Sequence, residues 1–313
     1  MNIIIIGGNG FVGRNIQEIL SAAPDINTVT SVSRENEFNL LNEKQNSKHE
    51  RILQQADYII NCAASVGSLN YVSERAAEII DTNSKINLNL YKIVKNLEAK
   101  ALIINPIATC GFPGELELYN EANFYNGPIH KSVLAYGATC RLLVEVTECY
   151  RMQYGIKSIN YYTPSMYGEF DSTDPNKAHA LNAIISKVVK AINMGTDLTI
   201  WGTGKPIREW LYVKDFARII LETILRHRTG EDFSHTINIG QNTGVSINHI
   251  LDIIVPMSGY EGNVNYDLTR QDGALSKVMD DNLFRKRFPT FEFTELTKGC
   301  LNTVNYYDSI YPY

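Results

Sequence analysis

The strongest pattern of hydrophobic and polar positions lies at the start of the chain. An unbroken β-branched run at Ile3–Ile6 predicts a strand buried on both faces, as in a parallel sheet. Glycines follow at a G-x-x-G-x-x-G spacing, at Gly7, Gly10 and Gly13. Apolar residues then recur at helical spacing over 14–20. The opening segment is therefore expected to be a strand, a glycine-rich turn and a helix.

Strand and helix patterns continue to alternate along the chain. Further strands are predicted at 28–33, 56–64, 101–104, 157–162, 198–201 and 236–240, and helices at 76–97, 134–154, about 178–194 and 213–227. Alternation of this kind implies right-handed parallel crossovers. The predicted fold class is α/β: a Rossmann-type doubly wound parallel sheet with a smaller mixed α/β substrate domain. Shorter, more mixed structure is expected beyond residue 240.

The pattern changes after residue 163, where a polar loop over 169–177 interrupts the alternation. A chain of 313 residues is long enough for two domains. We expect a cofactor-binding domain of residues 1–163 plus about 212–243. The substrate-binding domain is expected to take about 164–211 plus 244–313.

Composition narrows the classes of partner. The net charge of -5 gives no indication of binding to nucleic acid or to an anionic membrane, so any phosphate must be held by a local cluster. Five unevenly spaced cysteines without a C-x-x-C pair indicate reduced thiols and a cytoplasmic location. No apolar run approaches the length that spans a bilayer, and the start does not resemble a signal peptide. No metal site is expected.

The opening turn is typical of a dinucleotide site. Glycines let the backbone approach a pyrophosphate, and the helix N-terminus offers unpaired N–H groups and a positive dipole end. Ser33 and Arg34 end the second strand about twenty residues later, where an NAD site usually has an acidic residue. An arginine there suits a 2′-phosphate, which predicts NADP(H). The alternatives are an ordinary βα turn and a solvated loop arginine.

With these segments placed, the chain resembles the extended short-chain dehydrogenase/reductases, and among them the GDP-L-fucose synthase family. The matching stretches are Gly7–Gly13, 38–42, 63–67, 108–113, Tyr136 on its helix, His179 opening a helix, 200–210 and 270–273. The resemblance implies cofactor contacts at Gly7, Gly10, Phe11, Val12, Gly13, Ser33, Arg34, Asn39, Leu40, Ala63, Ala64, Tyr136 and Pro164. Asn39 and Leu40 would run beside the adenine.

That family epimerises GDP-4-keto-6-deoxymannose at C3 and C5 and then reduces it at C4 with NADPH. The resemblance makes Cys110 the epimerisation base, His179 the acid and Tyr136 the proton donor for reduction. Thr109 stands beside the usual serine position. Substrate contacts are implied at Ser65, Lys187, Trp201, Arg208 and Lys277. Independently, a thiol and an imidazole suit proton transfer on two sides of a carbon, although either alone is commonly a core or surface residue.

The chain departs from the family at its tyrosine helix. The family pattern is Tyr-x-x-x-Lys, and here Cys140 stands four residues after Tyr136, on the same helix face. The lysine normally holds the nicotinamide ribose and lowers the tyrosine pKa. The usual serine is Ala108. His130 and Lys131, just upstream, belong to no recognised motif, but a lysine from elsewhere could fill the gap.

The missing lysine affects the possible reactions unequally. Oxidation needs tyrosinate, and an ordinary tyrosine is only about 0.1% ionised at pH 7. Reduction needs the protonated phenol, and epimerisation needs neither. We therefore expect an NADP(H)-dependent enzyme that epimerises, and secondarily reduces, a 4-keto sugar nucleotide for surface glycan synthesis. GDP is the favoured nucleotide, and a homodimer is expected by resemblance. The alternatives are a dehydratase or 4-epimerase on the same scaffold, and an inactive NADP-binding sensor or partner subunit.

Overall fold

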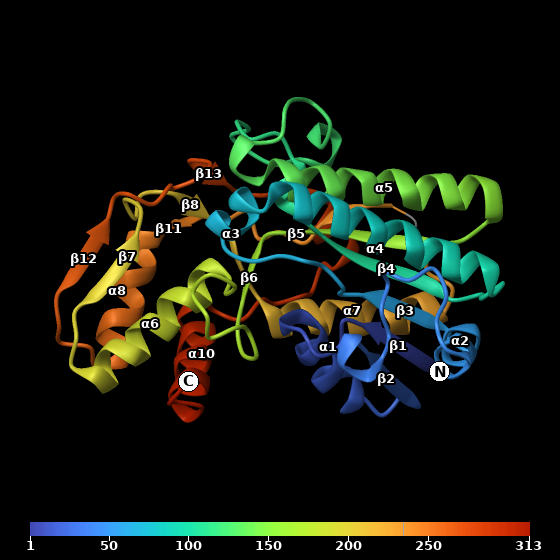
Figure 1. Cartoon of the computed structure of the whole chain (residues 1–313), viewed down its shortest axis with the longest axis horizontal. Helices are drawn as coiled ribbons and strands as arrows, with labels where there is room; N and C mark the ends of the chain where they lie inside the picture. The colour runs from blue at the N-terminus through green and yellow to red at the C-terminus, as the bar shows by residue number, and fades with distance from the viewer. Residues whose placement is uncertain (234) are drawn as a thin grey trace.

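Six parallel strands form the central layer of the protein (Figure 1). The computed structural model describes residues 1–233 and 235–313. The strands are β1 (Asn2–Ile6), β2 (Thr28–Val32), β3 (Tyr58–Asn61), β4 (Leu102–Ala108), β5 (Ser158–Thr163) and β10 (Ile237–Asn238), in the order β10-β5-β4-β3-β1-β2. Every neighbouring pair is parallel. The order runs outward in both directions from β1 and β3, which confirms the predicted doubly wound class.

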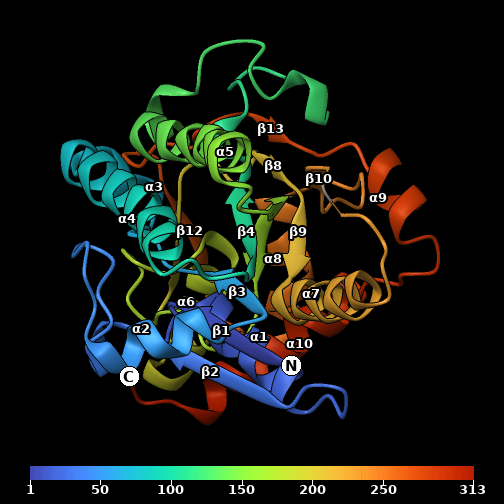
Figure 2. The same cartoon turned by 90° about the vertical axis from the view of Figure 1, so that its right-hand side faces the viewer.

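Helices cover both faces of this sheet (Figure 2). Helices α4 (Ala76–Asn96) and α5 (Leu134–Tyr154) lie on one face, and α1 (Phe11–Ser21) and α7 (Val213–Arg228) on the other. Strand β1 is continuously apolar because both of its faces are buried. Ile4 and Ile6 pack in the core on the α4 and α5 side, and Ile3 and Ile5 in the core on the α1 and α7 side. All four are at most 2% exposed.

A second group of elements lies beside the carboxyl end of the sheet (Figure 1). It contains the strand pairs β6 (Ser165–Tyr167) with β9 (Trp210–Tyr212) and β7 (Leu198–Trp201) with β12 (Val264–Asp267). Strand β8 (Ile207–Arg208) lies between β11 (Val245–Ser246) and β13 (Ser276–Lys277). The helices of this group are α6 (Ala180–Met194), α8 (Ile247–Ser258) and α10 (Leu296–Ser309). They share one hydrophobic core, whereas the exact division of the chain into domains stays a prediction.

The expectation of only short, mixed structure beyond residue 240 is wrong, because α8 and α10 are substantial helices. Helix α8 carries Pro256 in its last turn, and α10 contains Gly299 and many polar residues. Propensity alone disfavours both segments, and packing against α6 stabilises them. Short helices at α2 (Ser47–Gln54), α3 (Leu69–Glu74) and α9 (Asn282–Arg287) also lack a clear sequence signal. In the described part of the chain, no helix is long and apolar enough to cross a membrane.

Candidate active site

A cavity of about 500 Å³ lies at the carboxyl edge of the parallel sheet, between the sheet and the second group of elements. Fourteen of the predicted site residues line it: Gly10, Phe11, Val12, Ala63, Ala64, Thr109, Cys110, Tyr136, Pro164, His179, Lys187, Trp201, Arg208 and Lys277. The rest lie outside its wall: Gly7, Gly13, Ser33, Arg34, Asn39, Leu40 and Ser65. The topology gathers the lining residues because parallel strands end at one edge.

The glycine-rich turn forms a cradle at one end of the cavity. Gly7 has φ +78°, and a Cβ there would lie 2.8 Å from the Cys62 backbone, so only glycine fits. Helix α1 begins at Phe11 after Gly10, with no side-chain cap and no acidic residue in its first turn. Among the described residues, no side chain caps its first N–H groups. This arrangement fits a pyrophosphate, as the predicted dinucleotide requires.

Arg34 lies beyond this cradle, in the 3-10 helix Arg34–Asn36 that follows β2. Its side chain is exposed and has no polar partner among the described residues, whereas its neighbour Glu35 bonds to Asn9 of the glycine turn. Arg34 is thus free to meet an anion. Leu40 is 4% exposed and belongs to the core, and the Asn39 side chain accepts a bond from Leu41 N–H. Contact of Asn39 and Leu40 with adenine stays a prediction.

Cys110 and His179 reach the cavity from different parts of the fold. Cys110 sits in the 3-10 helix Thr109–Gly111 directly after β4, and His179 is the N-cap residue of α6. Ser65 shows a different arrangement. Its backbone N–H and C=O both bond to the Asn83 side chain, at 2.8 and 2.9 Å, and it is not part of the cavity wall.

His179 has a carboxylate partner that the sequence did not reveal. Asp171, in the polar loop before α6, is 9% exposed. Its Oδ2 lies 3.1 Å from His179 Nδ1 and accepts bonds from His179 N–H at 2.8 Å and Asn182 Nδ2 at 2.7 Å. Burial alone would lower the pKa of His179, but the charge and hydrogen bond of Asp171 outweigh it and raise that pKa above 6.5. Burial alone would raise the pKa of Asp171. The charge and hydrogen bond of His179 act in the opposite direction, and the pKa of Asp171 is lowered.

We expect Asp171→Asn to lower the pKa of His179, because burial then acts unopposed. In the wild type this pair stabilises the fold fully between pH 3.8 and pH 6.5. The contribution is lost as pH rises through the raised pKa of His179 and as it falls through the lowered pKa of Asp171. The alkaline limb of the pH–rate profile for C–H exchange should therefore move to lower pH in the variant. An NMR titration of the histidine rings measures the shift directly. Asp174→Asn, in the same loop, is the control, and an unmoved His179 titration would contradict the assignment.

Tyr136 lies in a site without a compensating cation. Burial raises its pKa well above 10, and the neighbouring Cys140 and Cys110 add to the shift. None of the described cationic side chains is among the groups that act on this pKa. Cys140 is 5% exposed, and burial raises its pKa too; Lys277 acts on it in the opposite direction without overcoming burial. His130 bonds to Ser132 and does not line the cavity. Tyr136 is therefore protonated at neutral pH, and very little tyrosinate is available.

Cations gather at the far end of the cavity. Burial lowers the pKa of Lys187 to about 8, and the charge of Arg270 adds to the effect. Lys187 Nζ lies 4.1 Å from the centre of the Trp201 ring, and the Arg270 guanidinium lies 4.8 Å from the same ring. Arg208 donates to the backbone carbonyls of Ile207 and Asp272, at 2.7 and 3.2 Å. This end can bind a phosphate group by charge, as the sequence predicts.

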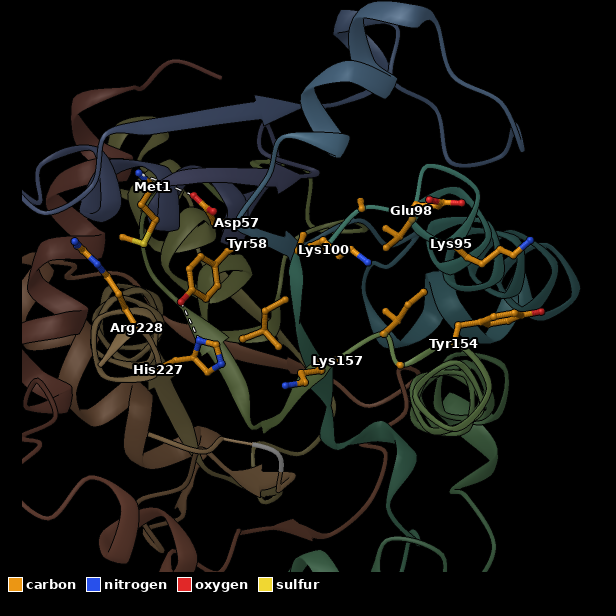
Figure 3. Close-up of a pocket in the computed structure, with 16 residues that line it drawn as sticks. Met1, Asp57, Tyr58, Lys95, Glu98, Lys100, Tyr154, Lys157, His227 and Arg228 are labelled. Atoms are coloured by element: carbon orange, nitrogen blue, oxygen red, sulfur yellow. Dashed lines mark hydrogen bonds and ion pairs between the residues drawn. The ribbon is translucent and has the colours of Figure 1, made fainter. Parts of the chain in front are cut away.

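A second hollow, of about 870 Å³, lies at the opposite, amino edge of the sheet (Figure 3). None of the predicted site residues lines it. Its wall carries Lys95 and Arg228, which stand in the last turns of α4 and α7. Cations at helix C-termini stabilise the helix dipole. A bond of 2.9 Å joins Tyr58 and His227 across one side of the hollow. The predicted site residues that line a cavity line the smaller one.

Comparisons with known proteins agree with this geometry. The model of the NAD dependent epimerase/dehydratase family matches residues 3–240. The chain is 25% identical to a GDP-L-fucose synthase of Dictyostelium discoideum, over 97% of this chain and 94% of that one. It is 26% identical to a GDP-L-colitose synthase of Yersinia pseudotuberculosis, over 98% of both.

Among solved structures, a GDP-L-fucose synthetase from Naegleria fowleri bound to NADP has the same fold. Its TM-score is 0.83 at 24% identity, over 99% of this chain and 94% of that one. The family match covers more than half of the chain and confirms the resemblance drawn from its motifs. This protein belongs to the NAD dependent epimerase/dehydratase family, within the extended short-chain dehydrogenase/reductases.

Proposed function

We propose that the protein is an NADP(H)-dependent epimerase and 4-ketoreductase of a GDP-linked 4-keto-6-deoxy sugar. The observation that supports this most strongly is the joint position of Cys110, Tyr136 and His179 on the wall of one cavity. A thiol and an imidazole from different elements can serve two sides of a sugar carbon. Arg208 and Lys187, at the far end, provide charge for a diphosphate.

In the proposed epimerisation, the Cys110 thiolate removes a proton from C3 or C5, which the 4-keto group acidifies. The electron pair moves into an enolate. Protonated His179 returns a proton to the opposite face, so that the product is an isomer of the substrate. Asp171 favours the protonated form of His179, which this step needs. We also propose that the Thr109 hydroxyl lies beside the keto oxygen of the substrate.

In the proposed reduction, bound NADPH would supply a hydride for C4. Tyr136 gives its phenolic proton to the alkoxide that forms, and solvent then restores the proton. A raised tyrosine pKa suits this direction and opposes the reverse. A dehydratase or 4-epimerase begins with oxidation at C4, which requires Tyr136 as a base. The electrostatics of Tyr136 therefore favour epimerisation and reduction over that alternative.

The direct test is incubation with GDP-4-keto-6-deoxymannose in deuterium oxide, with and without NADPH. We expect deuterium at C3 or C5 by NMR in both mixtures, and consumption of NADPH in the second. Absence of both signals would rule out this substrate. Transient nicotinamide absorbance with NADP and a UDP- or dTDP-hexose would instead support the oxidation-first alternative.

The choice of NADP(H) over NAD(H) depends on Arg34. We expect Arg34→Ala to weaken NADPH binding by about 10- to 100-fold, since a charge-assisted phosphate contact is lost. NADH binding should change little, because NADH has no 2′-phosphate. Isothermal titration with both cofactors measures the difference. Arg51→Ala, at an exposed position of α2, is the control. Equal losses for NADPH and NADH would contradict the role of Arg34.

We further propose that the protein forms a homodimer through α4 and α5, which lie side by side on one face (Figure 1). Large apolar side chains are exposed on these helices: Ile80, Leu88, Leu134, Met152 and Tyr154. Apolar exposure of this kind is common at interfaces between subunits. The molar mass in solution, by light scattering, tests this proposal.

The five cysteines are unpaired, and the cytoplasmic location they indicate stays a prediction.

A further inference from the structure

Three asparagines form a buried row across neighbouring strands of the sheet. Asn61 ends β3, Asn105 lies in β4 and Asn160 lies in β5, and all three are at most 7% exposed. Asn61 Nδ2 donates to Asn105 Oδ1 at 3.3 Å, and Asn105 Nδ2 donates to Asn160 Oδ1 at 3.0 Å. Asn160 Nδ2 in turn donates to Thr147 Oγ1 at 3.0 Å. Buried amides of this kind are costly unless each polar atom has a partner.

The direction of donation along this row is fixed at its far end. Thr147 Oγ1 donates to the Val144 carbonyl at 2.7 Å, so its oxygen accepts from Asn160. Each amide is then oriented by the next, and the row ends at Asn61 Oδ1. That oxygen is buried and has no partner among the described residues. A buried acceptor without a donor is costly, so the open end of the row requires an N–H or O–H group.

The residue at the open end of the row belongs to the cavity wall. Asn61 is part of the cavity wall, together with Thr139 and Cys140 of α5 and Asn87 of α4. Asn87 Nδ2 donates to the Thr139 carbonyl at 3.0 Å, which joins the two helices at this point. The residues named here are neutral, and one of them, Cys140, stands where the family pattern has a lysine. A neutral acceptor carries no positive charge, so it does not lower the raised pKa of Tyr136 as a lysine would.

We propose that Asn61 holds the nicotinamide ribose of the cofactor, with its Oδ1 accepting a hydrogen bond from a ribose hydroxyl. The inference rests on the proposed binding of NADP(H). The hydroxyl supplies the donor that the row lacks, and the row in turn fixes the orientation of the amide. Asn61 is therefore a positioning residue that replaces the ribose contact of the missing lysine but not its charge. The cofactor stays in place while Tyr136 stays protonated.

The test is the binding of three ligands to Asn61→Leu, which has the same branching at Cγ but no hydrogen-bond acceptor. The ligands are NADPH, 2′-phospho-ADP-ribose, which keeps the ribose but lacks nicotinamide, and 2′,5′-ADP, which lacks both. We expect the Kd of the first two to rise about fivefold to tenfold, as for one lost hydrogen bond, and that of 2′,5′-ADP to stay unchanged. Thr147→Val removes the group that fixes the direction of the row, so it should raise the same two Kd values to a smaller degree and leave that of 2′,5′-ADP unchanged.

The other possible results distinguish failure of the Asn61 assignment from failure of the proposed cofactor. An unchanged Kd for all three ligands, or an equal loss for all three, overturns the role of Asn61. A loss for NADPH alone places the contact on the nicotinamide amide and overturns the ribose assignment. Wild-type protein that binds neither NADPH nor 2′,5′-ADP contradicts the proposed cofactor itself. A measurement that needs no variant is binding of NADPH analogues with a deoxygenated nicotinamide ribose, at 2′ or 3′. At least one should bind the wild type more weakly, and equal affinity of both with NADPH overturns the inference.

Discussion

Cys110→Ser should abolish deuterium incorporation at C3 and C5, with a loss of about 10²- to 10⁴-fold in the exchange rate. A serine hydroxyl is far less acidic than a thiol, so it supplies no base at neutral pH. The measurement is the initial rate of exchange by NMR with the 4-keto substrate in deuterium oxide. Reduction of an already epimerised 4-keto sugar by NADPH should continue, because that step does not use the thiol.

The control for this result is Cys149→Ser. Cys149 is exposed on α5 and does not line the cavity, so its replacement should leave exchange unchanged. His179→Gln should lose exchange to a similar degree, because the glutamine amide does not release a proton at this pH. Full exchange in Cys110→Ser or in His179→Gln would contradict the proposed pair. If both variants also retained the biological activity of the protein, the non-catalytic sensor or partner subunit would become the better explanation.

Tyr136→Phe should suppress reduction at C4 by about 10²- to 10⁴-fold, because the alkoxide then has no positioned proton donor. Deuterium exchange at C3 and C5 should persist, since Cys110 and His179 perform that step. The rate of NADPH consumption, followed by absorbance, measures the loss. The pH dependence gives a second signature. Because burial raises the pKa of Tyr136 well above 10, the wild-type rate should show no loss from tyrosine ionisation up to about pH 9.

The matched control is Tyr154→Phe, because Tyr154 is on the same helix but is half-exposed and outside the cavity. It should reduce substrate at the wild-type rate. Loss of exchange and reduction together in Tyr136→Phe would indicate a collapsed cavity, and a thermal unfolding measurement would detect it. Reduction at an undiminished rate in a folded Tyr136→Phe would show that another group protonates the alkoxide.

The sequence and the structure agree most closely where a pattern is local. Helix α5 has the predicted bounds at both ends, because its apolar spacing continues to Gly155, which adopts the left-handed cap. Strand β7 also has its predicted bounds. Helix α1 begins three residues before the predicted segment, since the glycine turn ends at Gly10 rather than at Gly13. Glycine spacing indicates the turn but does not mark the residue at which the helix starts.

Agreement ends where a structure depends on distant neighbours. Asp171 lies in a polar loop with no motif of its own, and only the fold brings it to His179. The asparagine row has one member in each of three strands, so no sequence spacing reveals its pairing. Arg270 belongs to a matching stretch, yet its place over Trp201 arises from the pairing of β12 with β7. Helices α8 and α10 depend on a shared core more than on propensity.

By itself the sequence determined the doubly wound α/β class, the family resemblance and the absence of the motif lysine. These follow from short segments, in which apolar periodicity, glycine spacing and residue identity act within a few turns of chain. Only the tertiary structure showed that burial raises the pKa of Tyr136 and that no described cation is among the groups acting on it. Likewise, only the fold pairs His179 with a carboxylate and leaves Asn61, a residue of the cavity wall, with an Oδ1 that has no described partner. The physical reason is that burial and charge act through space, between residues that the chain order keeps apart.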